Sequence, residues 1–217
     1  MTSINSIRKY APSDRNRIFE IGADTAFFGD PIEAYLEDRF IFLDAFYAYY
    51  TDLEPSGSWV ACSGEKVVGF LTGCLNTKRY QQDLLMVIAP KVLKKLFLGK
   101  YKIGKRSLSY FLGLSHELFH ANKYKIDYFT YPAHFHINVD KKSRGNRLGS
   151  ELITCFLSQL ANARVPGVYL LTTSENKIAC KLYEKMGFNL LWSKSDHFWT
   201  HFLGREVLGL CYGRIIN

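Results

Sequence analysis

The clearest pattern of hydrophobic and polar positions runs from residue 131 to residue 188. Residues 131–139 predict a strand, and a basic, glycine-containing turn follows over residues 140–149. Apolar residues then recur at intervals of three and four, which predicts an amphipathic helix; they are Leu152, Ile153, Phe156, Leu157 and Leu160. Residues 168–171 predict a buried strand, and a short helix through Ala179 ends at Gly187, where a capping glycine is expected.

We call residues 131–188 the unit. Before it, the chain predicts a strand over 6–10 and a helix that begins at Pro12, Ser13 and Asp14 and continues through Phe27. An aromatic-rich helical region is predicted over 32–50. Two strands, 59–62 and 66–74, flank a tight turn at 63–65. After the unit, closing strands are expected at 189–192 and 206–212, linked by an aromatic turn at 196–199.

Residues 76–127 form a longer connection with two predicted helices. The first is basic and partly amphipathic, with apolar positions at Val92, Leu93, Leu96, Phe97 and Leu98, and the second spans about 107–121. Two interpretations fit this segment. It is an accessory helical layer packed on the same domain, or its basic amphipathic surface meets a membrane surface or an acidic partner.

Composition and charge narrow the class of protein. With 217 residues, of which 47% are hydrophobic, the chain is long enough for one well-buried domain. It has no apolar stretch of membrane-spanning length, and we expect no export segment. Five scattered cysteines are typical of a reduced protein, which favours a cytoplasmic location, with the nucleus as the alternative. The net charge of +8 fits an anionic cofactor and also permits nucleic acid or acidic lipid.

The turn over 140–149 has the features of a phosphate-binding loop. A helix that begins near Leu148 leaves its first backbone N–H groups without partners, and its dipole places partial positive charge there. Glycines let a ligand approach the backbone closely. Four basic residues lie in the same turn before the helix; they are Lys141, Lys142, Arg144 and Arg147. The alternative is an ordinary strand-to-helix turn with solvated basic residues.

Two segments of the unit resemble the signature of the GNAT superfamily of acyl-CoA-dependent N-acyltransferases. The motif Arg/Gln-x-x-Gly-x-Gly/Ala is similar to residues 144–149, and Asn-x-x-Ala-x-x-x-Tyr-x-x-x-Gly-Phe is similar to Asn176, Ala179, Tyr183, Gly187 and Phe188. One departure is Arg147, which stands where the family has its middle glycine. The resemblance implies an α/β fold: a twisted, mixed, mostly antiparallel sheet flanked by helices, whose fourth and fifth strands are parallel and splay apart.

The resemblance further implies one N-acetyltransferase domain over 1–217, with a helical insertion at about 77–127. Such an enzyme moves an acetyl group from acetyl-CoA, its cosubstrate, to a primary amine by direct attack in a ternary complex. The residues implied in cofactor binding are Ile137, Asn138, Val139, Arg144, Gly145, Asn146, Arg147, Leu148, Gly149, Ser150, Asn176 and Tyr183. The aromatic region over 32–50 contains candidates to line the acceptor pocket. The expected partners are acetyl-CoA and an amine acceptor, nucleic acid is not expected, and the protein is expected to be a monomer or a homodimer.

The catalytic residues follow in part from the resemblance and in part from spacing. By the resemblance, Tyr183 protonates the departing thiolate as general acid. The strand over 131–139 lacks the glutamate that many family members use as base. His134 and His136 stand two apart, so in a strand they share a face, and an imidazole titrates near neutral pH. Either histidine is a candidate base, with an ordered water as the competitor.

Two other functions compete with the transferase. His116-Glu117-Leu118-Phe119-His120 spells a zinc-protease motif, but no third ligand stands at a familiar downstream spacing, so no metal is expected. A catalytically silent acyl-CoA-binding or regulatory module would keep the cofactor site without turnover. Arg147 and the missing strand glutamate are the features that favour this second alternative. The identity of the amine is not determined by the sequence.

Overall fold

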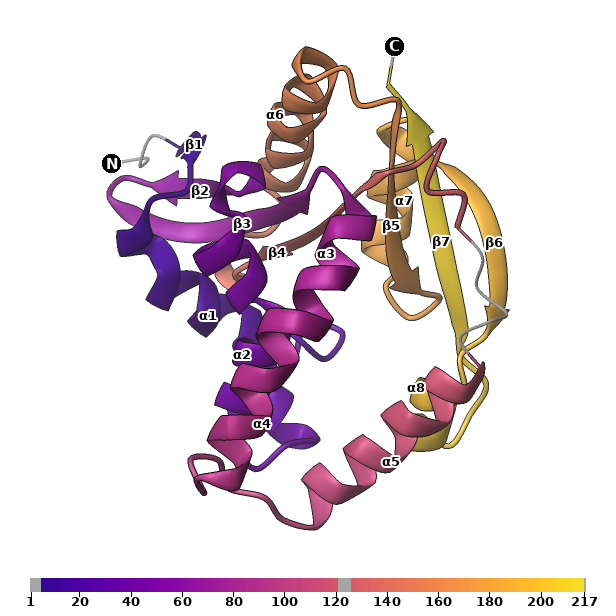
Figure 1. The fold of residues 1–217 in the computed structure, drawn as a ribbon. Coiled ribbons are helices and arrows are strands. Elements are labelled where there is room, and N and C mark those ends of the chain that lie inside the picture. The colour runs from indigo at the N-terminus through magenta and orange to yellow at the C-terminus, as the bar shows by residue number, and fades with distance from the viewer. Residues whose placement is uncertain (1–4, 121–125, 217) are drawn as a thin grey trace.

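The computed structural model describes residues 5–120 and 126–216, except the side chains of 116–120. A seven-stranded sheet in the order β1-β2-β3-β4-β5-β7-β6 forms its centre (Figure 1). The strands are β1 (Asn5–Lys9), β2 (Trp59–Ser63), β3 (Lys66–Cys74), β4 (Ala133–Val139), β5 (Gly167–Thr173), β6 (Asn189–Ser195) and β7 (Leu208–Ile215). The longer helices are α1 (Arg15–Asp24), α2 (Arg39–Phe46), α3 (Thr77–Asp83), α4 (Ala89–Phe97), α5 (Lys105–His120), α6 (Leu148–Asn162), α7 (Lys177–Lys185) and α8 (His197–Leu203).

The pairing of β4 with β5 is the one parallel pairing in the described sheet, and it is short. It covers only Ala133 with Val168 and His134 with Tyr169, after which the two strands diverge. All other neighbouring strands pair antiparallel. The mixed, mostly antiparallel sheet and its splayed fourth and fifth strands are therefore confirmed.

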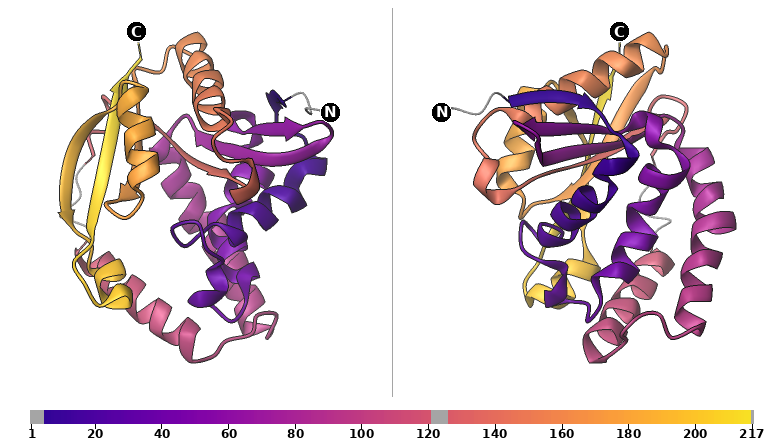
Figure 2. Two further views of the ribbon diagram at one scale, coloured as in Figure 1. Left: turned by 180° about the vertical axis from the view of Figure 1, so that it is seen from behind. Right: turned by 90° about the vertical axis from the view of Figure 1, so that its left-hand side faces the viewer.

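Helices cover both faces of the sheet, as Figure 2 shows from two further sides. The period of two along β4 separates the two layers: Phe135 packs into the core under α6 and α7, while His134 and His136 face the aromatic residues of the other layer. On the α6 side, Leu152, Ile153, Phe156 and Leu160 are fully buried, as their spacing predicts. The opposite core gathers residues of α1, α2, β2 and β3.

The termini of several elements follow from local chemistry. Helix α7 ends as predicted, because Gly187 adopts φ 78° and the N–H of Phe188 donates to the carbonyl of Tyr183 at 3.0 Å. Helix α1 stops at Asp24, short of the predicted Phe27, since residues 27–30 form a turn with Gly29 at φ 97°. The predicted turn at 196–199 is instead the start of α8, because the Asp196 carboxylate accepts the Trp199 N–H at 2.9 Å.

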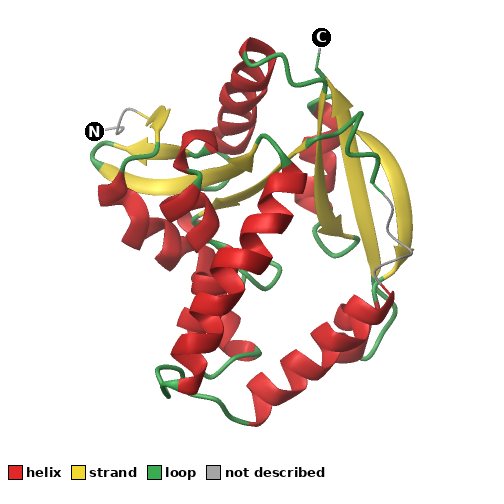
Figure 3. Ribbon diagram, in the orientation of Figure 1, coloured by secondary structure: helices red, strands yellow, loops and turns green. Residues whose placement is uncertain are grey.

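The long connection between β3 and β4 is helical, with α3, a π-helical segment (Leu84–Ile88), α4 and α5 (Figure 3). One side of this segment, at Ile88, Val92 and Leu96, packs on the core beneath α1 and α2. The Glu37 carboxylate fixes the beginning of α5 by accepting the N–H groups of Arg106 and Ser107, each at 2.9 Å. Among the described residues, no helix combines the length and apolar character that crossing a membrane requires.

Candidate active site

The divergence of β4 and β5 leaves part of the β4 main chain facing a gap. The Asp140 N–H donates to the Val68 carbonyl at 2.9 Å, and the β3–β4 register continues without a shift. Because peptide groups in a strand alternate in direction, even-numbered β4 residues direct their N–H and C=O toward β3. Ile137 and Val139 therefore direct theirs toward β5, beyond the point where the β4–β5 pairing stops.

The N-terminus of α6 lies directly after β4 and its basic turn. Arg147, the N-cap residue, has φ 60° and ψ 3°, the left-handed conformation that glycine adopts most readily. The first turn is closed by the Glu151 N–H, which donates to the Arg147 carbonyl at 3.1 Å. The N–H groups of Leu148, Gly149 and Ser150 precede this bond, and such groups have no intrahelical acceptor. They form a site for an anion.

The basic turn is anchored to the layer of α1. Asp140 pairs with Arg17 at 2.8 Å, and Lys141 pairs with Asp30 at 2.5 Å. The Arg144 Nε donates to the Val139 carbonyl at 3.2 Å, so this guanidinium lies across the end of the gap beside Gly29. The turn therefore has a defined position, and Arg144 contacts a main-chain group that faces the gap.

The second signature segment brings two polar residues to the α7 end of the unit. Asn176 is exposed at the N-terminus of α7, and its side chain makes no capping hydrogen bond. Tyr183 is 5% exposed and packs against Phe135, with 6.3 Å between the ring centroids. Burial raises the pKa of the Tyr183 hydroxyl above its usual range, so it keeps its proton at neutral pH.

His134 and His136 share a face of β4, as predicted, and one tyrosine hydroxyl joins them. The Tyr50 hydroxyl lies 2.7 Å from His134 Nε2 and 3.1 Å from His136 Nε2. On its other side, His134 Nδ1 lies 2.7 Å from Thr77 Oγ1. Tyr50 is fully buried and His134 is 5% exposed, whereas His136 is half-buried.

The directions of these hydrogen bonds assign the tautomers. A carbonyl only accepts, so the Thr77 hydroxyl donates its single proton to the Pro132 carbonyl at 2.8 Å. His134 must then donate from Nδ1 to Thr77, which leaves its Nε2 to accept from the Tyr50 hydroxyl. The Tyr50 oxygen in turn accepts from His136 Nε2. This chain of bonds leaves the lone pair of His136 on Nδ1.

Burial also keeps both imidazoles neutral. Desolvation lowers the pKa of His134 well below 6.5, with a further contribution from His136. Desolvation alone lowers the pKa of His136 to about 4. The rings of Phe46 and Tyr50 lie over His136, with centroid distances of 4.5 and 5.5 Å. The pair is thus a neutral hydrogen-bonded unit under an aromatic wall.

The basic turn and the N-terminus of α6 directly follow β4, whereas Tyr183 packs beside Phe135 on the face of β4 opposite to His134 and His136. Asn138 directs its main chain to β3, and its side chain is hydrogen-bonded to Tyr47 at 3.2 Å and to Thr25 at 2.7 Å. Sequence reasoning missed the roles of Tyr50 and Thr77 beside the histidines. They lie 84 and 57 residues before His134, and only the packing of the segment Tyr49–Leu53 and of α3 on β4 brings them there.

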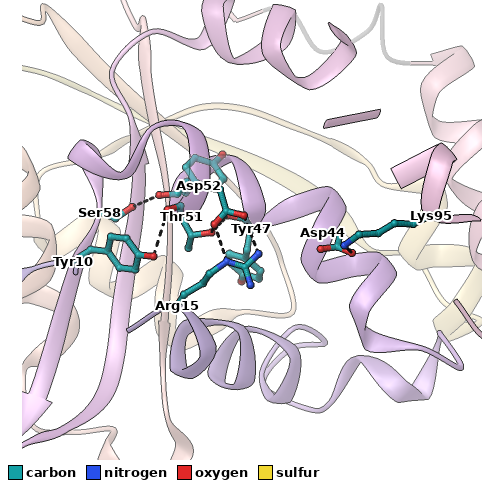
Figure 4. Close-up of polar contacts among 9 residues, drawn as sticks. Tyr10, Arg15, Asp44, Tyr47, Thr51, Asp52, Ser58 and Lys95 are labelled. Atoms are coloured by element: carbon teal, nitrogen blue, oxygen red, sulfur yellow. Dashed lines mark hydrogen bonds and ion pairs between the residues drawn. The ribbon is translucent and has the colours of Figure 1, made fainter. Parts of the chain in front are cut away.

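A separate groove of about 980 Å³ lies between α1, α2 and α4. Ion pairs cross or border it: Arg15 with Asp52 at 2.7 Å, and Lys95 with Asp44 at 2.6 Å (Figure 4). None of the residues that line it belongs to β4, β5, the basic turn or α7. The main-chain groups of β4 that are directed away from β3 converge instead with the N-terminus of α6 at the β4–β5 gap.

The zinc-protease motif lies at the end of α5. The side chains of His116, Glu117 and His120 fall outside the described residues. Within the part of the chain that the structure describes, histidine, cysteine, aspartate and glutamate side chains form no group of three suited to a metal ion.

Comparisons with known proteins agree with this geometry. Residues 120–188 match the acetyltransferase (GNAT) family. The fold matches the crystal structure of SsHAT with a TM-score of 0.77, at 25% identity and with 98% of each chain covered. It also matches yncA of Salmonella typhimurium, which was solved with its cofactor acetyl-CoA; the TM-score is 0.58, the identity 13%, and the match covers 98% of this chain and 94% of that one.

A third similar structure is the ribosomal-protein-S18-alanine N-acetyltransferase of Escherichia coli. Its TM-score is 0.55 at 15% identity, covering 99% of this chain and 95% of that one. Residues 120–188 therefore resemble the GNAT acetyltransferases in sequence, as the two motifs indicate, and the splayed sheet matches the fold of these structures. The family match and the fold together support an acyltransferase.

Proposed function

We propose that the protein transfers an acetyl group from acetyl-CoA to a primary amine by direct attack in a ternary complex. The main-chain groups of Ile137 and Val139 carry this proposal, because they face a gap that ends at the N-terminus of α6. A pantetheine arm binds there as an additional strand, and the diphosphate accepts hydrogen bonds from main-chain N–H groups of residues 145–150. Arg144 leaves the Val139 carbonyl and turns to the diphosphate. Asn176 contacts the pantetheine arm.

Stabilisation of the transition state follows from this position. The thioester carbonyl lies at the far end of the pantetheine arm from α6, where a main-chain N–H of β4 stabilises the developing oxyanion. Tyr183 retains its proton at neutral pH and gives it to the departing thiolate. The carbon–sulfur bond breaks as the carbon–nitrogen bond forms.

The amine loses its proton to the histidine pair. The lone pair on His136 Nδ1 is the acceptor, and Tyr50 with His134 holds that tautomer. Burial weakens the imidazole as a base, but it also disfavours a cationic amine in the same aromatic site. Burial lowers the pKa of the imidazole and that of the amine in the same direction. The difference between the two pKa values, which governs proton transfer, therefore changes less than either value.

Release of free thiol from acetyl-CoA, measured across a panel of amines, tests this function. We expect turnover with at least one amine, and loss of it in Tyr183→Phe and His136→Gln with acetyl-CoA binding retained. Binding without turnover on any amine would favour the silent acyl-CoA-binding module. Activity of Tyr183→Phe equal to the wild type at every pH would remove Tyr183 from the mechanism.

A further inference from the structure

The excess positive charge of the protein comes from one helical segment away from the cofactor site. The whole chain has 28 Lys and Arg residues against 20 Asp and Glu. Residues 77–106 contain nine of the former and one of the latter, which leaves 19 of each in the rest of the chain. The net charge of +8 therefore belongs to α3, α4 and the start of α5, not to the basic turn.

Most of this charge is free to meet a partner. Arg79, Lys95 and Arg106 form ion pairs with Asp83, Asp44 and Glu37. The other six side chains are exposed, and no salt bridge to them occurs among the described residues; they are Lys78, Lys91, Lys94, Lys100, Lys102 and Lys105. A concentration of exposed cations on one segment attracts anionic surfaces.

The same segment exposes a row of apolar side chains. Met86, Pro90, Leu93 and Phe97 recur at intervals of four, three and four, so they form one stripe along the helix axis. Phe97 is 87% exposed and Met86 78%. The stripe is distinct from the positions at Ile88, Val92 and Leu96 that pack on the core. The helix thus has an apolar inner side, an apolar outer stripe and lysines beside it.

We propose that this outer stripe (Met86, Leu93 and Phe97, with Pro90) docks on an anionic lipid bilayer. Apolar side chains reach the acyl boundary, while neighbouring lysines such as Lys91 and Lys94 lie along the headgroups with their stems on the surface. A nucleic acid would use the charges but leave the apolar stripe in water. Charge and apolar exposure on one helix together fit a lipid surface.

Sedimentation with lipid vesicles tests the proposal with the full chain and without reference to activity. We expect binding to equal mixtures of phosphatidylcholine and phosphatidylserine, and none to phosphatidylcholine alone. Salt at about 1 M, where the Debye length is about 3 Å, should weaken binding strongly. Because a basic residue near such a surface contributes about 1 kcal/mol, the double variant Lys91→Gln/Lys94→Gln should bind roughly 25-fold more weakly.

The apolar contribution has a matched control elsewhere on the chain. Leu93→Ser/Phe97→Ser should lose most of the binding. Leu190 and Phe129 are exposed to almost the same extent, 51% and 88% against 50% and 87%, so Leu190→Ser/Phe129→Ser should retain it. Lys66→Gln/Lys185→Gln, which changes two exposed lysines on other elements, should likewise retain most of it. Thermal melting of each variant checks that the fold is intact.

Three results would overturn the proposal. One is the absence of wild-type binding to phosphatidylserine vesicles. Another is equal binding by Leu93→Ser/Phe97→Ser and its control pair, which would reduce the surface to a general polyanion site. The third is a wild-type protein that binds heparin but not vesicles, with heparin binding lost in Lys91→Gln/Lys94→Gln and kept in Leu93→Ser/Phe97→Ser. This result would indicate a nucleic-acid or acidic-protein partner instead.

Discussion

Replacing Tyr50 by phenylalanine removes one buried hydroxyl that holds two histidines. The hydroxyl lies 2.7 Å from His134 Nε2 and 3.1 Å from His136 Nε2, and Tyr50 has no exposed surface. In Tyr50→Phe the ring keeps its packing, but an acceptor on His134 and a donor on His136 lose their partner. Buried polar groups left without a partner cost about 1–3 kcal/mol.

We therefore expect Tyr50→Phe to lower the free energy of unfolding by about 2 kcal/mol, or the melting temperature by roughly 4–8 °C for a chain of this size. Urea denaturation with a fluorescence readout measures the difference. Tyr49→Phe is the matched control, because Tyr49 is equally buried but its hydroxyl meets only Cys74 Sγ, at 3.8 Å among the described contacts. It should cost well under half as much.

The same substitution distinguishes a catalytic role of His136 as the proposed base from a purely structural role. If Tyr50 holds the His136 tautomer, Tyr50→Phe lowers kcat and shifts its pH profile, while the Kd for acetyl-CoA stays at the wild-type value. Equal losses of stability in Tyr50→Phe and Tyr49→Phe would refute the hydrogen-bond chain. An unchanged kcat with the expected loss of stability would confine the network to a structural role.

Three further predictions concern stability. Both histidine pKa values are lowered in the folded state, so the unfolded chain binds more protons below pH 6.5. The free energy of unfolding should therefore fall from pH 6.5 to pH 5, with a slope approaching about 1.4 kcal/mol per pH unit for each histidine. Urea titrations at several pH values measure this slope, and His134→Gln/His136→Gln should flatten it. At position 147, where φ is 60°, glycine should be more stable than alanine by about 1 kcal/mol, the reverse of the order in helices, and equal melting temperatures would contradict this. Gly73→Ala would place a Cβ 2.3 Å from Phe156 Cε2 and should cost about 1–3 kcal/mol, with Phe156→Leu in the same chain recovering part of the loss.

The sequence predicts the half of the site that is local. The strand, the basic turn, α6 and α7 follow one another within sixty residues, so their periodicity and glycines suffice to place them. Even Arg147 fits, because its left-handed backbone accounts for the glycine that the family signature has there. The end of α1 and the start of α8 differ from expectation because a single turn and a single aspartate cap decide them.

The acceptor side depends on contacts between distant segments. Tyr50 comes from the helical region after α2 and Thr77 from the start of the long connection, and no spacing links either to His134. The net charge of +8 likewise fits an anionic cofactor, a nucleic acid or an acidic lipid, and its excess lies on residues 77–106. Total charge permits several kinds of partner, but only the fold shows which surface carries the charge.

Backbone amide shifts during titration with acetyl-CoA test the central claim most directly. The amides of Ile137 and Val139 and those of 145–150 should shift at saturation, while that of Asn138, which faces β3, should change much less. The groove between α1, α2 and α4 is the competing location. If the shifts gather instead on groove residues such as Asn16, Leu43 and Val92, with β4 unaffected, the cofactor does not bind between the diverging strands.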